Sequence, residues 1–144
     1  MCLAEVERCF NKGLLQKRGP SIDLARKSIR QADIFLKDAG KLIDSDMTRM
    51  SVLALYNAFF HAARALLFKD GIKERSHFCV ARYVESEYVL NNRLDKRFVL
   101  FLDSLRDMRH NTQYSLDFVE VDEDLNIIYN TCLEFIGEMK KLIE

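Results

Sequence analysis

Residue types that can act on a phosphate group come together in the segment LRDMRHNTQY, residues 105–114. Arginine grips a phosphate through parallel N–H donors, and histidine changes its charge near neutral pH, so that it can move a proton. Arg109 and His110 are therefore the candidate catalytic pair for phosphate chemistry that needs no metal ion. The neighbouring candidates for binding the same phosphate or nucleotide are Arg106, Asn111 and Tyr114.

Arg109 falls on the apolar side of the helix expected around it. It follows Leu102 by seven residues and Leu105 by four, a spacing that puts the three side chains on one face. Burying an unpaired charge there costs several kcal/mol, so Arg109 needs a partner or an open cleft. Phosphate binding and a structural ion pair both remain open. The candidate carboxylates for the ion pair are Asp103, Asp107 and Asp117.

A second set of polar side chains interrupts a long apolar segment. Asn57, His61 and Arg64 follow one another at i, i+4 and i+7, so they lie along one side of a helix. Polar groups on a buried helix must find partners. They either satisfy one another and the nearby backbone, or they face Arg109 across a cleft and help to bind an anion.

The elements that position these residues are expected to be helices. One proline and five glycines are few breaks for 144 residues, and no alternation is long enough to indicate a strand. Six helices are expected, near residues 3–14, 21–43, 46–70, from 76, from 95, and from 122 to the C-terminus. The expected N-caps are Ser21, Asp46, Ser76, Asp95 and Asp122. Gly19 and Pro20 are expected to end the first helix, and Gly71 the third.

The third of these helices is apolar nearly all round. Such a helix lies in the middle of a bundle or is shared with a second subunit. We therefore expect an all-α protein of one domain, an antiparallel bundle of five to six helices that forms a homodimer through helices including the third or fifth. The apolar stretch Val52–Phe68 is short and carries polar residues, so we expect a soluble protein with no membrane partner.

Charge, cysteines and histidines limit the possible functions. Twenty-two basic residues balance twenty-two acidic ones, so nucleic acid binding would need a local patch. The cysteines show no C-x-x-C spacing and are expected to be reduced, structural thiols of a cytoplasmic protein. The three histidines lie far apart and no glycine-rich phosphate loop is present, so neither a metal site nor a cofactor is expected. The cysteines are Cys2, Cys9, Cys79 and Cys132.

Three segments in order carry a family resemblance: ALYNAFFHAARALLFKDGI at 54–72, ERSHFCV at 74–80 and LRDMRHNTQYSLDFVEVDED at 105–124. Together they resemble the HEPN domain family, and more narrowly its short stand-alone prokaryotic members, whose genes often lie beside a minimal nucleotidyltransferase. The resemblance covers residues 21–144, so we expect a HEPN-like helical domain there and an additional N-terminal helix in residues 1–20. It adds His77 to the candidate phosphate ligands Asn57, His61 and Arg64.

At the candidate site the sequence differs from the pattern of the catalytic family members. In the catalytic HEPN ribonucleases an arginine is followed after four to six residues by a histidine, and two such motifs face each other across a dimer. Here Arg109 matches that arginine, but Tyr114 stands where the histidine is expected. Arg106 and His110 have the right types with only three residues between them.

Three functions are consistent with these residues. The first is a HEPN protein that binds a nucleotide or RNA phosphate and acts with a nucleotidyltransferase partner, as one half of a toxin–antitoxin-like pair. The second is a metal-independent endoribonuclease that uses Arg109 and His110. The third is a non-catalytic helical scaffold dimer. Tyr114 is a poor general base at neutral pH, so we expect binding to be stronger than cleavage.

Overall fold

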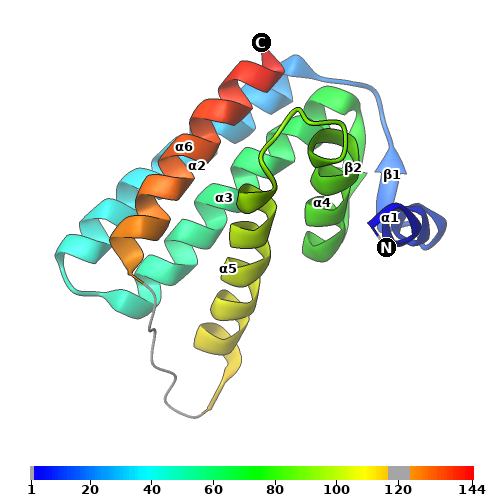
Figure 1. Cartoon of the computed structure of the whole chain (residues 1–144). Helices are drawn as coiled ribbons and strands as arrows, with labels where there is room; N and C mark the ends of the chain where they lie inside the picture. The colour runs from blue at the N-terminus through cyan, green and yellow to red at the C-terminus, as the bar shows by residue number, and fades with distance from the viewer. Residues whose placement is uncertain (1, 117–123) are drawn as a thin grey trace.

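The computed structural model describes residues 2–116 and 124–144, with side chains from residue 3 onward. Within these ranges the chain forms six α-helices, one short π-helix and two short strands (Figure 1). The elements in chain order are α1 (Cys2–Asn11), β1 (Leu15–Lys17), α2 (Ile22–Asp44), α3 (Thr48–Asp70), β2 (Ile72–Glu74), α4 (His77–Val84), η1 (Glu85–Val89), α5 (Lys96–Tyr114) and α6 (Leu125–Ile143). The predicted all-α class is confirmed.

The centre of the bundle is α3. Figure 1 shows α2 and α6 along one side of it and α4 and α5 along the other, with α2 and α3 antiparallel. Leu55, Phe59 and Leu66 on α3 have no exposed surface. By length and composition alone α3 could cross a membrane, but 72% of its apolar window is buried inside the bundle. Its lack of a polar face is therefore explained within one chain, and the homodimer stays a prediction.

Short side chains fix several helix ends as the sequence indicated. Ser21 accepts a hydrogen bond from the Leu24 N–H at 3.1 Å, and Ser76 and Asp95 cap α4 and α5 in the same way. Gly71 ends α3 with a φ of 79°, and a Cβ there would come within 2.5 Å of the Arg18 carbonyl oxygen. Glycine is therefore required at this position.

The starts of α3 and α6 differ from the caps that the sequence predicted. Asp46 does not cap α3, because the backbone is left-handed there, with a φ of 57°. The helix begins two residues later at Thr48, and Met47 at its start makes no side-chain cap bond. Asp122 lies outside the described residues. The cap of α6 is Asp124, whose carboxylate accepts the Asn126 N–H at 2.9 Å.

The segment after α1 differs from the prediction. The helix ends at Asn11 and the chain turns at Gly13, with a φ of 71°, rather than continuing to Gly19 and Pro20. Leu15–Lys17 then pairs antiparallel with Ile72–Glu74, with Leu15 opposite Glu74. Leu15 is almost fully buried. A strand of three residues is too short to show alternation, so the sequence pattern could not indicate it.

A disulfide joins α1 to α4. Cys9 and Cys79 are bonded across a sequence separation of 70, with their Cα atoms 5.9 Å apart. The prediction that these cysteines are reduced is therefore wrong for this pair. Sequence spacing could not reveal the bond, because the packing of α1 against α4 brings the two residues together. Cys132 is a buried free thiol, as expected, and the side chain of Cys2 lies outside the described residues.

Candidate phosphate-binding site

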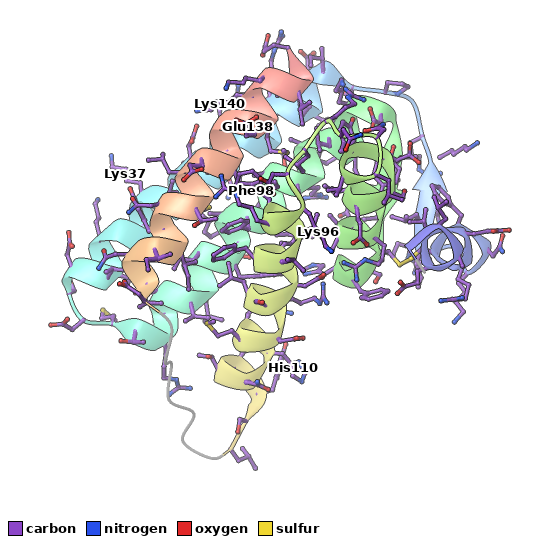
Figure 2. All side chains as sticks on the ribbon, in the orientation of Figure 1. Lys37, Lys96, Phe98, His110, Glu138 and Lys140 are labelled. Atoms are coloured by element: carbon purple, nitrogen blue, oxygen red, sulfur yellow. A yellow bond between two sulfur atoms is a disulfide. The ribbon has the colours of Figure 1, made fainter. Side chains whose placement is uncertain are left out.

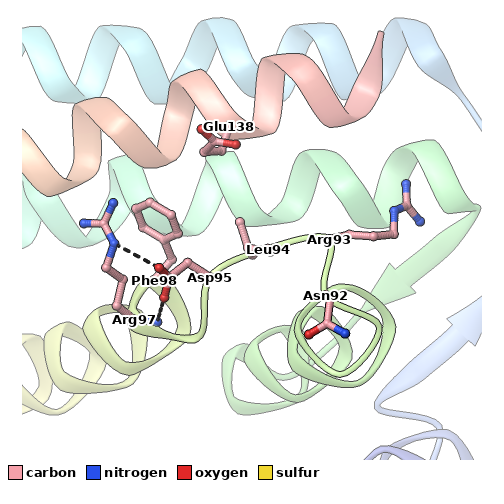
Figure 3. A pocket seen from close by; sticks show the side chains of 7 residues that line it. All are labelled: Asn92, Arg93, Leu94, Asp95, Arg97, Phe98 and Glu138. Atoms are coloured by element: carbon pink, nitrogen blue, oxygen red, sulfur yellow. Dashed lines mark hydrogen bonds and ion pairs between the residues drawn. The ribbon is translucent and has the colours of Figure 1, made fainter.

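A polar hollow near the start of α5 is lined by equal numbers of acidic and basic side chains. It has a volume of about 450 Å³, and Figure 3 shows its lining residues. Arg97 forms ion pairs there with Asp95, at 3.6 Å, and with Glu134 of α6. Its lining residues are Asn92, Arg93, Leu94, Asp95, Arg97, Phe98 and Glu138. The two arginines of this lining are balanced by two carboxylates, so the hollow offers no excess positive charge to an anion.

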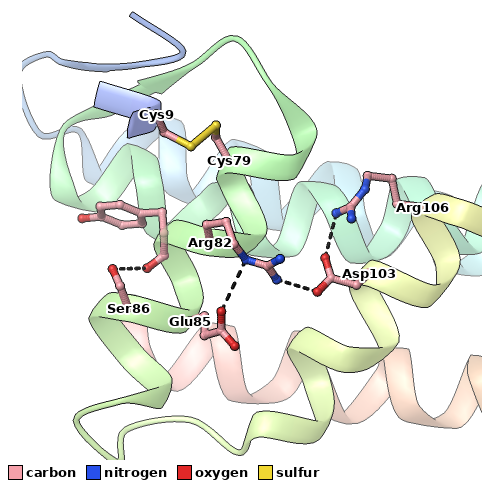
Figure 4. A network of polar contacts seen from close by, with 8 residues as sticks. Cys9, Cys79, Arg82, Glu85, Ser86, Asp103 and Arg106 are labelled. Atoms are coloured by element: carbon pink, nitrogen blue, oxygen red, sulfur yellow. Dashed lines mark hydrogen bonds and ion pairs between the residues drawn. A yellow bond between two sulfur atoms is a disulfide. The ribbon is translucent and has the colours of Figure 1, made fainter. Parts of the chain in front are cut away.

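A second charged group lies between α4 and α5 and is also balanced. The Asp103 carboxylate of α5 accepts hydrogen bonds from Arg82 of α4 and, at 2.7 Å, from Arg106 one turn further along α5 (Figure 4). Glu85 pairs with Arg82 at 3.3 Å. Two carboxylates thus match two guanidinium groups. Asp103, a predicted partner of Arg109, is engaged with other arginines.

Arg109 is different because its charge is not matched in this way. Its Cζ lies 4.9 Å from the centroid of the Tyr56 ring on α3, and among the described residues its one hydrogen bond is a long 3.4 Å contact with Gln113. Its Nε is buried and has no hydrogen-bond partner among the described residues. The guanidinium therefore lies against helix α3, as its position on the apolar stripe predicted.

The absence of a counterion is notable for a half-buried arginine. No ion pair between Arg109 and Asp103 or Asp107 occurs within residues 2–116 and 124–144, and Asp117 lies outside them. The aromatic ring of Tyr56 supplies cation–π attraction but no acceptor for the N–H donors. A buried donor without a partner has a free-energy cost of about 1–3 kcal/mol. An added anion would remove that cost.

His77 lies on the same tyrosine as Arg109. The Tyr56 hydroxyl and His77 Nδ1 are 2.8 Å apart, and the His77 ring stacks on Phe60 with centroids 4.0 Å apart. Burial, and then the Arg109 charge, lowers the pKa of His77. Burial raises the pKa of Tyr56 to about 12, so its hydroxyl keeps its proton at neutral pH. Tyr56 thus contacts both the uncharged imidazole of His77 and the guanidinium of Arg109, which has no ion pair among the described residues.

Two of the polar residues of α3 make contacts with other segments of the chain. His61 stacks on Phe35 of α2 with centroids 5.4 Å apart, and Arg64 forms a 3.0 Å ion pair with Glu74. Burial, and then Arg64, lowers the pKa of His61. Asn57 is half-buried on the same helix. Among the described residues the ring that Arg109 contacts is that of Tyr56, and a site that joins Arg109 with these α3 side chains, including those of a second subunit, stays a prediction.

His110 projects away from the Arg109 position. Successive residues on a helix are about 100° apart, and His110 is exposed, with its ring 5.1 Å from that of Tyr114 (Figure 2). Asn111 and Tyr114 are also exposed. Within one chain, the histidine that contacts Tyr56 together with Arg109 is therefore His77. The proposed catalytic roles of Arg109 and His110 stay predictions.

Comparison with known proteins places this arrangement in a family. The HEPN domain model matches residues 25–142. The chain belongs to the HEPN domain family. A protein of Methanocaldococcus jannaschii named "Putative toxin MJ0605" is 22% identical over 135 residues, covering 94% of this chain and 95% of that relative.

The HEPN match covers the helices that position Arg109 and Tyr56 but leaves out the N-terminal part of the chain. It begins at Ala25, so α1 and β1 lie outside it. Arg109, which resembles the family arginine, has a buried Nε with no hydrogen-bond partner and no ion pair among the described residues, whereas the Nε atoms of Arg64 and Arg82 face Glu74 and Glu85. The sequence patterns did not single out Tyr56 as a site residue. Its place four residues before Phe60 was the available signal, because that spacing puts both rings on the face that meets His77.

Proposed function

We propose that this HEPN protein binds the phosphate group of a nucleotide or of RNA at a site centred on Arg109. The observation that supports it is the buried Nε of Arg109, which has no partner among the described residues while the guanidinium is held over the Tyr56 ring. A phosphate oxygen is the acceptor that such a donor prefers, because charge-assisted hydrogen bonds are the stronger ones.

The groups around Arg109 suit an anionic ligand. Arg106 is one helical turn earlier on α5 and is held by Asp103, and His77 on α4 is open to solvent over part of its surface. His77 is uncharged near neutral pH, so it adds a hydrogen-bonding group without repelling Arg109. A ligand phosphate would bring the charge that the site lacks.

The biological role we propose is that of the toxin-like half of a toxin–antitoxin pair. The name of the Methanocaldococcus relative supports this role. The resemblance to HEPN proteins encoded beside a minimal nucleotidyltransferase supports such an enzyme as the partner. Co-purification of the two proteins from a strain that expresses both would test the pairing.

The homodimer is part of the same proposal. On α5 a mostly apolar hollow of about 200 Å³ is lined by Leu100, Phe101, Ser104, Leu105 and Met108, together with Ile128 of α6. Leu100 itself is 54% exposed. An apolar surface of this kind supports self-association through α5. Light scattering at tens of micromolar should give twice the monomer mass, and a monomer there would contradict the dimer.

A second candidate function is metal-independent RNA cleavage, and the position of His77 favours it over a purely structural role. Arg109 and His77 meet on Tyr56 although they come from different helices. An arginine stabilises charge on a phosphate and a neutral histidine accepts a proton. Cleavage would then use His77 rather than His110.

The experiment for phosphate binding compares two arginines of the same helix. We expect Arg109→Ala to weaken binding of a fluorescent single-stranded RNA, measured by anisotropy, by about 1.5–3 kcal/mol, as for a lost hydrogen bond to a charged group. Arg97→Ala is the matched control, because Arg97 lies on α5 but pairs with Glu134. Equal effects of the two substitutions, or no binding by the wild type, would contradict the proposed function.

A further inference from the structure

Phe78 is a surface phenylalanine immediately after His77. It is the second residue of α4 and is 40% exposed. Two guanidinium groups lie over its ring: the Cζ of Arg82 is 4.9 Å from the ring centroid and the Cζ of Arg106 is 5.4 Å from it. The guanidinium groups cover part of the ring, and the part that stays exposed is an aromatic surface of the kind on which proteins stack unpaired nucleobases.

The ring is held in place before any ligand arrives. Ser76 caps the start of α4 by accepting the Cys79 N–H at 3.2 Å, and the disulfide from Cys79 to Cys9 follows Phe78 directly. Both arginines that contact the ring are tied to Asp103 (Figure 4). A ligand would therefore lose little free energy in ordering this surface.

The ring is also continuous with the phosphate site. Arg106 contacts Phe78 and lies three residues before Arg109, which is about one turn of α5. On α4, Phe78 follows His77, which forms a hydrogen bond with Tyr56. The ring of Tyr56 in turn contacts the Arg109 guanidinium. Phe78 is thus connected to Arg109 through Arg106 on α5, and also through His77 and the Tyr56 side chain. Apolar burial does not account for Phe78, since much of its surface is open to solvent.

We propose that Phe78 is a base-stacking subsite beside the Arg109 phosphate site, so that the ligand carries an unpaired nucleobase on its phosphate. This inference rests on the proposed function and narrows it. It excludes inorganic phosphate and double-helical RNA as the preferred ligands, because the first has no base and the second keeps its bases stacked inside the helix. A mononucleotide and single-stranded RNA share the required chemistry.

The chain contains no tryptophan, so Phe78→Trp introduces a single fluorescent reporter at the subsite. Titration with a single-stranded RNA octamer should quench this indole, whereas an abasic octamer with the same sugar–phosphate backbone should not. Leu90→Trp is the control, because Leu90 is 55% exposed at the far end of the α4–η1 segment. Titration with AMP separates the two sources: quenching by AMP at similar concentrations indicates a mononucleotide, and quenching by the octamer alone indicates RNA.

A binding measurement with Phe78→Ala and Phe78→Leu completes the test. Loss of one stacked base should weaken octamer binding by about 5- to 150-fold, and both variants should leave abasic octamer binding unchanged. If Phe78→Ala and Phe78→Leu bind the octamer as the wild type does while Arg109→Ala is impaired, the stacking subsite is wrong and phosphate binding stands. If the wild type binds neither octamer nor AMP, both the proposed function and this inference are overturned.

Discussion

The Tyr56 hydroxyl and His77 Nδ1 lie 2.8 Å apart, and this hydrogen bond joins the start of α4 to the middle of α3. Arg109 contacts the same tyrosine, because its guanidinium lies over the Tyr56 ring. One buried side chain from the central helix therefore positions a histidine and an arginine that come from different helices.

Tyr56→Phe should separate the hydrogen bond from the ring contact. The variant loses the bond to His77 but keeps the aromatic face beneath Arg109, so unfolding in urea should show a loss of about 0.5–1.5 kcal/mol, as for one hydrogen bond. RNA binding should change little. Tyr56→Leu removes the ring as well and should impair RNA binding clearly more than Tyr56→Phe. Equal binding by the two variants would show that the ring does not position Arg109.

RNA cleavage should distinguish the two histidines of the α4 and α5 region. We expect the wild type to cleave RNA weakly or not at all in the presence of a chelator, because no histidine occupies the Tyr114 position. Any cleavage that is measured should fall in His77→Ala and persist in His110→Ala, since His110 lies against Tyr114. Efficient cleavage that only His110→Ala abolishes, with the fold intact, would show that the sequence-based Arg109 and His110 pair is the correct one.

Acidification should destabilise the fold through two histidines. Burial lowers the pKa of both His61 and His77 in the folded protein, so the unfolded chain binds more protons once the pH falls below its histidine pKa of about 6.5. The free energy of unfolding should therefore be highest above pH 6.5 and decrease below it until the folded-state pKa values are passed. Urea titrations at pH 7.5 and pH 5.5 measure this difference. His61→Gln with His77→Gln should make it smaller, and an unchanged difference would assign it to other groups.

Reduction of the disulfide should lower stability without removing the bundle. Closing a loop between Cys9 and Cys79, which are 70 residues apart, restricts the unfolded chain and typically contributes about 2–4 kcal/mol. The melting temperature should fall in reductant, and Cys9→Ser should melt at that lower temperature with or without reductant. Four reactive thiols in the denatured, unreduced wild type would contradict the disulfide.

Local patterns predicted much of the fold. The caps at Ser21, Ser76 and Asp95 could be predicted because each bonds to a backbone N–H two or three residues away. The inward position of Arg109 followed from helical periodicity in the same way. Asp46 was misassigned because a short turn there requires a left-handed backbone, which no local pattern revealed.

The features that the sequence could not reveal depend on distant segments. The strand pair joins Leu15 to Glu74, and the disulfide joins Cys9 to Cys79. The contact between Arg109 and the Tyr56 ring is a third example. In each case the partner is set by how helices pack, which spacing along one helix does not encode.

The central claim is most directly tested by observing the Arg109 Nε–H by NMR. Its nitrogen has no hydrogen-bond partner among the described residues, so a phosphate that binds there should shift its signal strongly. The signal is assigned from its absence in Arg109→Lys, and the protein is titrated with a single-stranded RNA octamer. We predict that the Arg109 Nε–H moves more than that of Arg97. An unmoved Arg109 signal at saturating RNA, with other arginine signals shifting, would contradict the phosphate site.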